Sequence, residues 1–155
     1  MEMFHRFGLL LPGLAIMFTA AGCGSSDNVA VYPVKGKVAF NGKPMVGGGS
    51  ISLVPTGNQA GAAAGGEIKE DGTYELTTYK SGDGSMPGDF RVVITQVVFR
   101  EPGNSEDGQA PTADAPPPVP EDDRIPEIFG DPMQSPLTMK VEAKPNEINL
   151  DLKPQ

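Results

Sequence analysis

The chain has 155 residues, a formal net charge of −8, 20 glycines and 16 prolines, and no tryptophan. This length suits one modest domain with one core. An acidic chain without a basic stripe is a poor candidate for binding nucleic acid or anionic lipid through charge, because both contacts need lysine and arginine. The single cysteine, Cys23, cannot form an internal disulfide.

The N-terminal segment is typical of a secretory signal peptide. Residues 1–7, MEMFHRF, include His5 and Arg6, and residues 8–21, GLLLPGLAIMFTAA, carry no charge. That apolar run is shorter than the roughly twenty residues that a membrane-crossing helix needs. It ends in small residues, as the core of a signal peptide does. We therefore expect residues 1–22 to be removed from the mature protein.

The sequence AAGC, residues 20–23, resembles the lipobox of bacterial lipoproteins. The resemblance implies cleavage after Gly22 and attachment of a diacylglycerol, often with a third acyl chain, to Cys23. Two or more acyl chains anchor a protein stably. The alternative, an inert buried thiol, is disfavoured because a polar stretch follows, so residues 23–32 are interpreted as a flexible tether. Gly24 is not the Asp that retains lipoproteins at the inner membrane in some bacteria, which favours the outer membrane.

Residues 33–155 are predicted to form one all-β domain, because short alternating apolar runs are separated by turn signals. Asn41-Gly42 and Asp71-Gly72 predict tight hairpin turns. Residues 87–99 are the longest strand candidate, and their apolar residues on both sides predict a central strand covered on both faces. About seven short strands indicate a β-sandwich. The side chains expected to face the core are Val34, Val38, Phe40, Ile51, Leu53, Tyr74, Leu76, Phe90, Val92, Ile94, Leu137, Met139, Val141, Ile148, Leu150 and Leu152.

One stretch does not fit a sandwich. Residues 101–123 contain seven acids, no base and six prolines, and Val119 is their one β-branched residue besides Thr112. Such a segment buries too little apolar surface to offset its ordering entropy, so we expect a disordered acidic insertion. Residues 125–132, IPEIFGDP, are expected to return the chain to the domain as a short helical turn anchored by Ile125, Ile128 and Phe129.

The order of these motifs resembles the transthyretin-like, carboxypeptidase-regulatory-like β-sandwich. GKVAFNGKPMVGGGSISLVP is followed by GGEIKEDGTYELTTYKSGDGSMPGDFRVVIT, and the similarity covers residues 34 to about 100. The pattern is a strand that starts with glycine, a Gly-x-Pro turn, an Asp-Gly hairpin before an aromatic strand, and Pro-Gly before the closing strand. The tail is similar to that of small bacterial lipoproteins that carry this domain. The resemblance implies a domain without established chemistry.

The residues needed for most catalysis are missing. The only histidine, His5, lies in the segment expected to be removed, so His-based acid–base catalysis, Ser-His and Cys-His nucleophiles and most zinc or copper sites are disfavoured. Some transthyretin-like proteins hydrolyse 5-hydroxyisourate with histidines, an arginine and a Tyr-Arg-Gly-Ser ending, whereas this chain ends LKPQ. A glycosidase needs two carboxylates at a fixed separation, and the acids here lie in turns and in the acidic insertion.

Three binding or modification sites are weighed and disfavoured. Calcium needs six or more converging oxygens, and neither the three acids at residues 121–123 nor any other stretch matches the EF-hand spacing. Turn chemistry explains Asp71-Gly72 and Asp83-Gly84 equally well. A Lys-Asn isopeptide bond between Lys35 or Lys37 and Asn149 would need a buried site, whereas alternation places all three in solvent. Tyr79 is the one plausible exposed ring of a sugar platform, and is more simply a strand end.

The sequence therefore predicts a non-catalytic envelope lipoprotein, anchored through acylated Cys23, that acts as a structural or interaction module. No cofactor, metal site or catalytic residue is predicted. The partners expected are the membrane and an envelope protein or glycan, with no nucleic acid, and the oligomeric state stays open. The first alternative is a module that binds glycan, peptide or calcium through loop tips at one end of the sandwich. A hydrolase is the least favoured reading.

Overall fold

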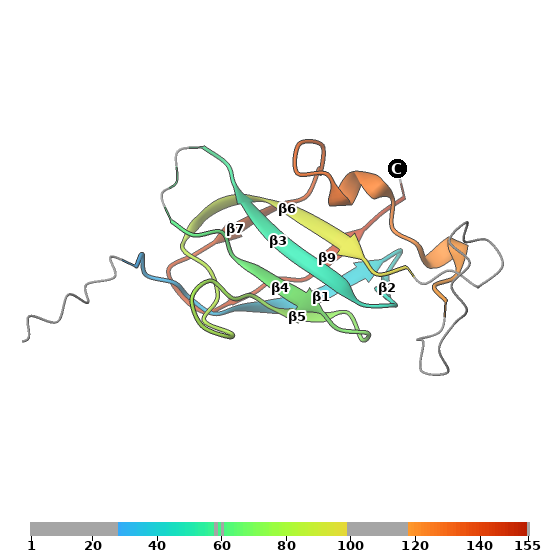
Figure 1. Ribbon diagram of the computed structural model, residues 1–155, viewed down its shortest axis with the longest axis horizontal. Coiled ribbons are helices and arrows are strands. Elements are labelled where there is room, and N and C mark those ends of the chain that lie inside the picture. The colour runs from blue at the N-terminus through green and yellow to red at the C-terminus, as the bar shows by residue number, and fades with distance from the viewer. Residues whose placement is uncertain (1–27, 58, 60, 99–117, 155) are drawn as a thin grey trace, which may run out of the picture.

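The computed structural model describes residues 28–57, 59, 61–98 and 118–154. Nine strands and two short 3₁₀ helices form in these residues (Figure 1). No helix within the described ranges has the length and apolar character needed to cross a bilayer. The elements are β1 (Val34–Phe40), β2 (Lys43–Pro44), β3 (Gly49–Pro55), β4 (Gly65–Ile68), β5 (Thr73–Glu75), β6 (Gly88–Gln96), η1 (Glu121–Asp123), η2 (Glu127–Gly130), β7 (Thr138–Val141), β8 (Asn146–Glu147) and β9 (Leu150–Leu152).

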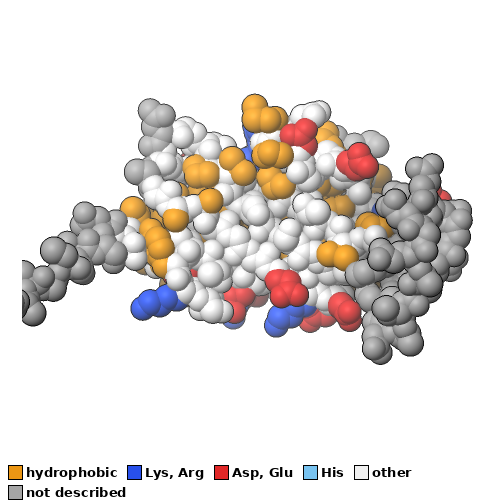
Figure 2. Space-filling model, viewed as in Figure 1, with side chains coloured by type: hydrophobic (Ala, Val, Ile, Leu, Met, Phe, Trp, Pro, Cys, Tyr) orange, Lys and Arg blue, Asp and Glu red, His pale blue; other side chains and the backbone are white. Residues whose placement is uncertain are grey.

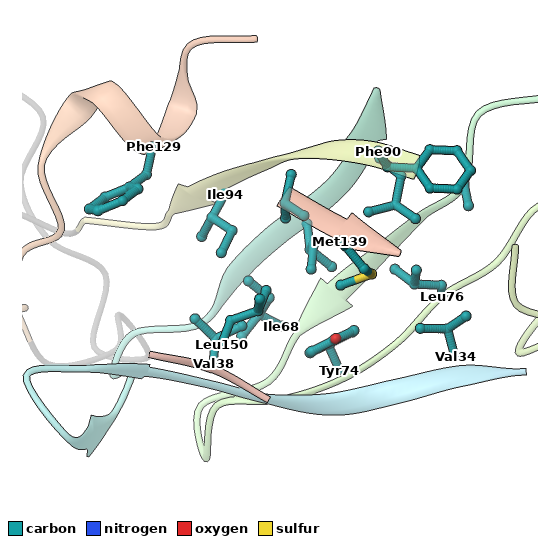
Figure 3. Close-up of a cluster of buried hydrophobic side chains, with 14 of the residues drawn as sticks. Val34, Val38, Ile68, Tyr74, Leu76, Phe90, Ile94, Phe129, Met139 and Leu150 are labelled. Atoms are coloured by element: carbon teal, nitrogen blue, oxygen red, sulfur yellow. The ribbon is translucent and has the colours of Figure 1, made fainter. Parts of the chain in front are cut away.

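The strands pair into one curled sheet in the order β2-β1-β5-β4-β3-β6-β7, and β8 and β9 pair with β1. All neighbours are antiparallel except β8 and β9, which run parallel to β1. The prediction of an all-β fold is confirmed. The pairing joins the strands into a single sheet whose curl places β1 and β6 on opposite sides of the core (Figure 3). The strands beyond the seven expected are β2 and β8, of two residues each.

Period-two alternation predicted most of the core correctly, while Leu137 and Ile148 are half-buried and pack against its margin. In β1, Val34, Val38 and Phe40 are buried while Lys35 and Lys37 are exposed. The same alternation buries the predicted residues of β3, β6, β7 and β9. Figure 3 shows Phe90, Ile94, Met139 and Leu150 among the side chains between the two halves of the sheet. The core residues that were not predicted are Met45, Ala64 and Met86, which lie between strands, and Ile68, which ends β4.

The two predicted hairpin turns are confirmed. Asn41 and Gly42 have φ of 52° and 76°, so both adopt the positive values of a two-residue turn between β1 and β2. The backbone N–H of Asn41 donates to Leu152 O, which ties this turn to the last strand. The second turn spans residues 69–72 between β4 and β5, and Gly72 there has φ of 78°.

The long strand differs from its prediction on one face. β6 lies between β3 and β7, so its central position is confirmed. Phe90, Val92 and Ile94 are buried, whereas Val93 is half-buried and Val97 is 44% exposed. The prediction of cover on both faces is therefore wrong at this end, because only the inner face of β6 meets the other half of the sheet. Phe99 lies outside the described residues.

The acidic insertion is shorter at its C-terminal end than predicted. Residues 99–117 lie outside the described residues, so disorder there stays a prediction. Residues 118–123 instead belong to the folded body, since Val119 is 3% exposed and residues 121–123 form η1. A methyl group at Gly47 would lie 2.5 Å from Val119 Cγ2, so a glycine makes room for this valine. The apolar contact of one valine thus ends the insertion earlier than its composition indicates.

A tyrosine crosses the first strand to reach the last part of the chain. Tyr74 of β5 pairs in register with Gly36 of β1, and its hydroxyl donates a 2.7 Å hydrogen bond to Ile148 O, which follows β8. A Cβ placed on Gly36 would lie 1.8 Å from that same carbonyl oxygen. The glycine therefore leaves the space through which Tyr74 and Ile148 meet. Burial raises the pKa of Tyr74, so the phenol stays protonated and remains a donor.

We expect Tyr74→Phe to lower the free energy of unfolding by about 1–2 kcal/mol, because the part-buried Ile148 carbonyl loses its donor. Tyr79→Phe is the matched control, since Tyr79 is 36% exposed. Urea denaturation of both variants measures the difference. Equal unfolding midpoints for the two variants would show that the Tyr74 hydroxyl contributes nothing specific.

Candidate ligand-binding groove

A groove of about 640 Å³ lies between the end of β6 and the segment 125–134 that carries η2. The space-filling view shows hydrophobic and acidic side chains close together along the upper edge of the molecule, over this segment (Figure 2). The side chains and backbone that line it are partly apolar and partly polar. The lining residues used below are Gln96, Val98, Ile125, Glu127, Ile128, Asp131 and Gln134.

The wall formed by residues 125–134 is held by apolar contacts, as its sequence predicted. Pro126 precedes η2, where a proline costs no helical hydrogen bond. Phe129 is buried in the core, and Ile125 and Ile128 pack against that core from the outside. The predicted short helical turn and its three anchors are thus confirmed. The residues between the anchors, Glu127 among them, face the groove or solvent.

Gln96 fixes the floor of the groove by joining three segments. Its amide nitrogen donates to Val46 O at 2.9 Å and to Asp123 O at 3.1 Å. Its amide oxygen accepts from Ile125 N–H at 3.0 Å. The side chain is therefore fully used in holding the loop before β3, η1 and the start of the η2 segment together. A glutamine at the end of a strand gives no signal of this role in the sequence.

The far end of the groove is closed by a turn at residues 131–135. The Asp131 carboxylate accepts from Met133 N–H at 2.7 Å and also from the amide of Gln134. Arg91 donates to the carbonyls of Pro132 and Met133, both at 2.9 Å. The Met133 N–H and the Gln134 amide, with a smaller contribution from Arg91, lower the pKa of Asp131. The carboxylate is therefore ionised at neutral pH.

The charge of the groove lining is wholly acidic within the described residues. Glu127 and Asp131 line it, and neither lysine nor arginine does. The Arg91 side chain is directed to the carbonyls behind the turn. The groove thus combines aliphatic side chains with two carboxylates, a combination that suits a ligand with both apolar and cationic groups.

The residues singled out in the sequence for attachment or modification lie elsewhere. Cys23 and the predicted cleavage after Gly22 lie outside the described residues. Lys35, Lys37 and Asn149 are all exposed, as predicted. Asn149 Oδ1 accepts the backbone N–H of Lys37 at 2.9 Å, so this side chain links the last part of the chain to β1.

The acids considered as calcium ligands hold turns. Asp71 accepts from the N–H and the hydroxyl of Thr73 at 2.9 and 2.6 Å. Asp83 accepts from the N–H groups of Thr78, Tyr79 and Lys80 at 2.7, 2.9 and 2.8 Å. In the described part of the chain, no group of three or more His, Cys, Asp or Glu side chains is placed to hold a metal ion.

The Asp83 turn predicts a pH-dependent stability. Desolvation raises the pKa of Asp83, but the backbone donors of Thr78, Lys80 and Tyr79 together lower it below its ordinary value of 3.8. A carboxyl group with a lowered folded-state pKa stabilises the fold above its unfolded pKa, and this stabilisation is lost as the pH falls through the folded pKa.

Asp83→Asn should therefore lower the thermal midpoint at pH 7, because an amide cannot accept hydrogen bonds through both of its heavy atoms. The difference from wild type should shrink as the pH falls below 3.8. Thermal unfolding followed by circular dichroism across pH 2–7 measures it. Glu70→Gln in the 69–72 turn serves as the exposed-acid control. A deficit that stays constant with pH would show that the charge of Asp83 is not involved.

The sequence did not predict a groove, although Ile125 and Ile128, which line it, were predicted as anchors of this segment. IPEIFGDPMQ places two acids four residues apart around two apolar anchors, so an amphipathic turn is visible in the letters. Gln96 lies about thirty residues away, and nothing in its neighbourhood separates it from any other polar strand residue.

Comparisons with known proteins place the chain at a distance from them. No family model matches the chain, and no curated protein matches it. Among solved structures, the crystal structure of a DUF3823 family protein from Parabacteroides merdae is similar, with 14% sequence identity and a TM-score of 0.40. The similarity covers 80% of this chain and 46% of that chain, so this chain spans about half the length of that protein.

Proposed function

We propose that the protein is a lipid-anchored envelope protein whose domain is a non-catalytic interaction module. Cys23 carries the acyl chains, and the groove beside η2 is the surface that binds a partner. We further propose that the domain is transthyretin-like and that its anchor lies in the outer membrane, with Gly24 after the acylated cysteine. The turns at Asn41-Gly42 and Asp71-Gly72, which lie between strands, support the proposal of a transthyretin-like domain.

The observation that carries this proposal is the position of the groove relative to the N-terminus. β1 begins where the N-terminal segment enters the domain, and β6 runs in the same direction as β1, because four antiparallel pairings separate them. The end of β6 therefore lies at the opposite end of the sheet from the start of β1 (Figure 1), and Gln96 is the last residue of β6. A chain anchored at Cys23 would present the groove away from the membrane.

The length of the connection supports the same arrangement. The tether predicted over residues 23–32 is shorter at its C-terminal end, because Tyr32 exchanges backbone hydrogen bonds with Ser85. Eight residues, 24–31, separate Cys23 from Tyr32, and at about 3.5 Å per residue they span at most about 28 Å. β6 adds nine residues at about 3.3 Å each, roughly 30 Å, between the anchored end and the groove. A partner on another envelope component is thus within reach without detachment of the acyl chains.

The roles of the acidic side chains support an interaction module over a hydrolase. Asp71, Asp83 and Asp131 accept backbone hydrogen bonds in their own turns, and Asp151 accepts from Gly42 N–H at 3.1 Å. These carboxylates organise loops. Glu127 and Asp131 both line the groove, and both carboxylate oxygens of Asp131 already accept hydrogen bonds from its own turn.

The test is the intact mass of the protein from its membrane fraction, compared with Cys23→Ser. We expect the mass of the wild-type protein to correspond to a chain that begins at Cys23 and carries acyl chains. We expect the Cys23→Ser variant to carry no acyl chains and to be absent from the fraction that contains the acylated wild-type protein. The control is Ser25→Ala, which keeps the cysteine and should be acylated normally. An unmodified mass for the wild-type protein would refute the anchor.

A further inference from the structure

Among the residues that the structure describes, nothing pairs with one backbone edge at the end of β6, beside the groove. β7 pairs with β6 only at residues 88–91, and the last bonds on this side are Val92 N–H to Leu137 O and the Ser135 hydroxyl to Val92 O. Backbone groups of alternate strand residues point to the same side, so those of Ile94 and Gln96 also point toward the η2 segment. Within the described residues, no hydrogen bond pairs the backbone groups of Gln96 on that side.

The other edge of this stretch is complete. β3 pairs with β6 from Phe90 to Gln96, and Val97 N–H continues the ladder by donating to Gly48 O. Residues 92–96 of β6 therefore extend beyond the pairing with β7 and are held by β3. On their other side Val92 is bonded to Leu137 and Ser135, and within the described residues the backbone groups of Gln96 are left unbonded. Ile94 is fully buried beneath η2, so Gln96, which is partly exposed, is where an added chain would reach the backbone.

We propose that the groove binds an extended peptide segment of a partner protein, with a lysine or arginine between apolar residues, by adding a strand to β6 at Gln96. This inference rests on the proposed function, in which the groove is the interaction site. Strand addition supplies affinity through backbone hydrogen bonds, while pockets for alternate side chains supply specificity.

The lining selects the chemistry of that peptide. Glu127 and Asp131 provide negative charge on the wall opposite β6, where a cationic side chain would be attracted. Val98 and Ile125 provide apolar contacts, and the exposed side chains of Val46 and Val97 continue the apolar surface at the same end of the sheet. In a strand whose residues alternate between basic and apolar, the basic side chains point to one face and the apolar side chains to the other. Such a peptide can place its basic side chains near the two carboxylates and its apolar side chains on the aliphatic surface.

The experiment uses the full chain in detergent and a fluorescent nine-residue peptide of alternating valine and lysine. We expect it to bind at least tenfold more tightly than the same peptide with glutamate in place of lysine. Because the protein carries a net charge of −8, a general attraction must be separated from the groove. Glu127→Lys should weaken binding of the lysine peptide at least fivefold. Glu147→Lys, the same charge change on exposed β8 near the anchored end, should weaken it less than twofold.

The backbone contribution is tested with a lysine peptide methylated on alternate amide nitrogens, which keeps the charge and removes the donors. We expect affinity to fall at least tenfold. Equal weakening by the two lysine variants, or equal affinity of the methylated and parent peptides, would overturn the inference. If Cys23 is acylated but the lysine peptide does not bind, the peptide-binding inference is wrong and the proposal of a lipid-anchored module stands. If the peptide binds but Cys23 is not acylated, the groove is a peptide site and the lipid anchor is wrong.

Discussion

Gly36→Ala should lower the free energy of unfolding by about 3 kcal/mol, because a new methyl group has no space. A Cβ at this position lies 1.8 Å from Ile148 O and 3.2 Å from Tyr74 Cε1. The first of these is a backbone atom, so it cannot turn aside as a side chain would. Either β1 separates from the chain between β8 and β9, or the Tyr74 hydroxyl loses its acceptor.

Urea denaturation with Gly130→Ala as the control measures this effect. A methyl group on Gly130 would meet Ile94 O at 3.6 Å and Thr95 Oγ1 at 3.8 Å, both ordinary contacts. We expect its stability to stay within about 1 kcal/mol of wild type, since the smaller entropy of the unfolded chain offsets minor strain. If the two alanine variants are equally stable, the close approach of Ile148 to β1 is wrong.

Phe129→Ala should lower the free energy of unfolding by about 4 kcal/mol, the usual cost of emptying a core site of a phenylalanine. Phe129 is 2% exposed and is the one fully buried side chain of η2. Because the same segment forms one wall of the groove, the variant should also lose binding to the lysine peptide. Circular dichroism during urea unfolding gives the stability, and peptide anisotropy below the transition gives the binding.

Met133→Ala is the matched control for Phe129→Ala. Met133 lies four residues further along the same segment and is 80% exposed, so its removal should change stability by less than about 0.5 kcal/mol. It should also leave peptide binding unchanged, because Met133 does not line the groove. Equal losses for the two variants would mean that Phe129 does not anchor the segment.

The alternation of apolar residues was enough to predict the strands and their inward faces. Val34, Val38 and Phe40 illustrate this, since a strand with one buried face has a single register that hides all three. The turn at Asn41-Gly42 was also predictable from the sequence, because few other residue pairs tolerate positive φ at two successive positions. These are local properties, which chain chemistry determines without knowledge of distant segments.

The groove was not predictable in the same way. Its negative charge is visible in the letters at Glu127 and Asp131, but its free backbone edge depends on where β7 stops pairing with β6. That limit is imposed by the turn at residues 131–135. Asp131 holds this turn locally through Met133 N–H, and Arg91 holds it through carbonyls about forty residues further along the chain.

The sequence alone determined the all-β class, the two hairpin turns, the inward residues and the anchoring by Ile125, Ile128 and Phe129, because each depends on local spacing and turn chemistry. Only the tertiary structure decided that the strands form one curled sheet and that Tyr74 crosses Gly36 to reach Ile148. It also decided that Gln96 joins three segments beside an open strand edge. These features arise where segments that are distant in the chain compete for the same backbone donors, acceptors and space. Such competition produces no periodic pattern of residues from which it could be predicted.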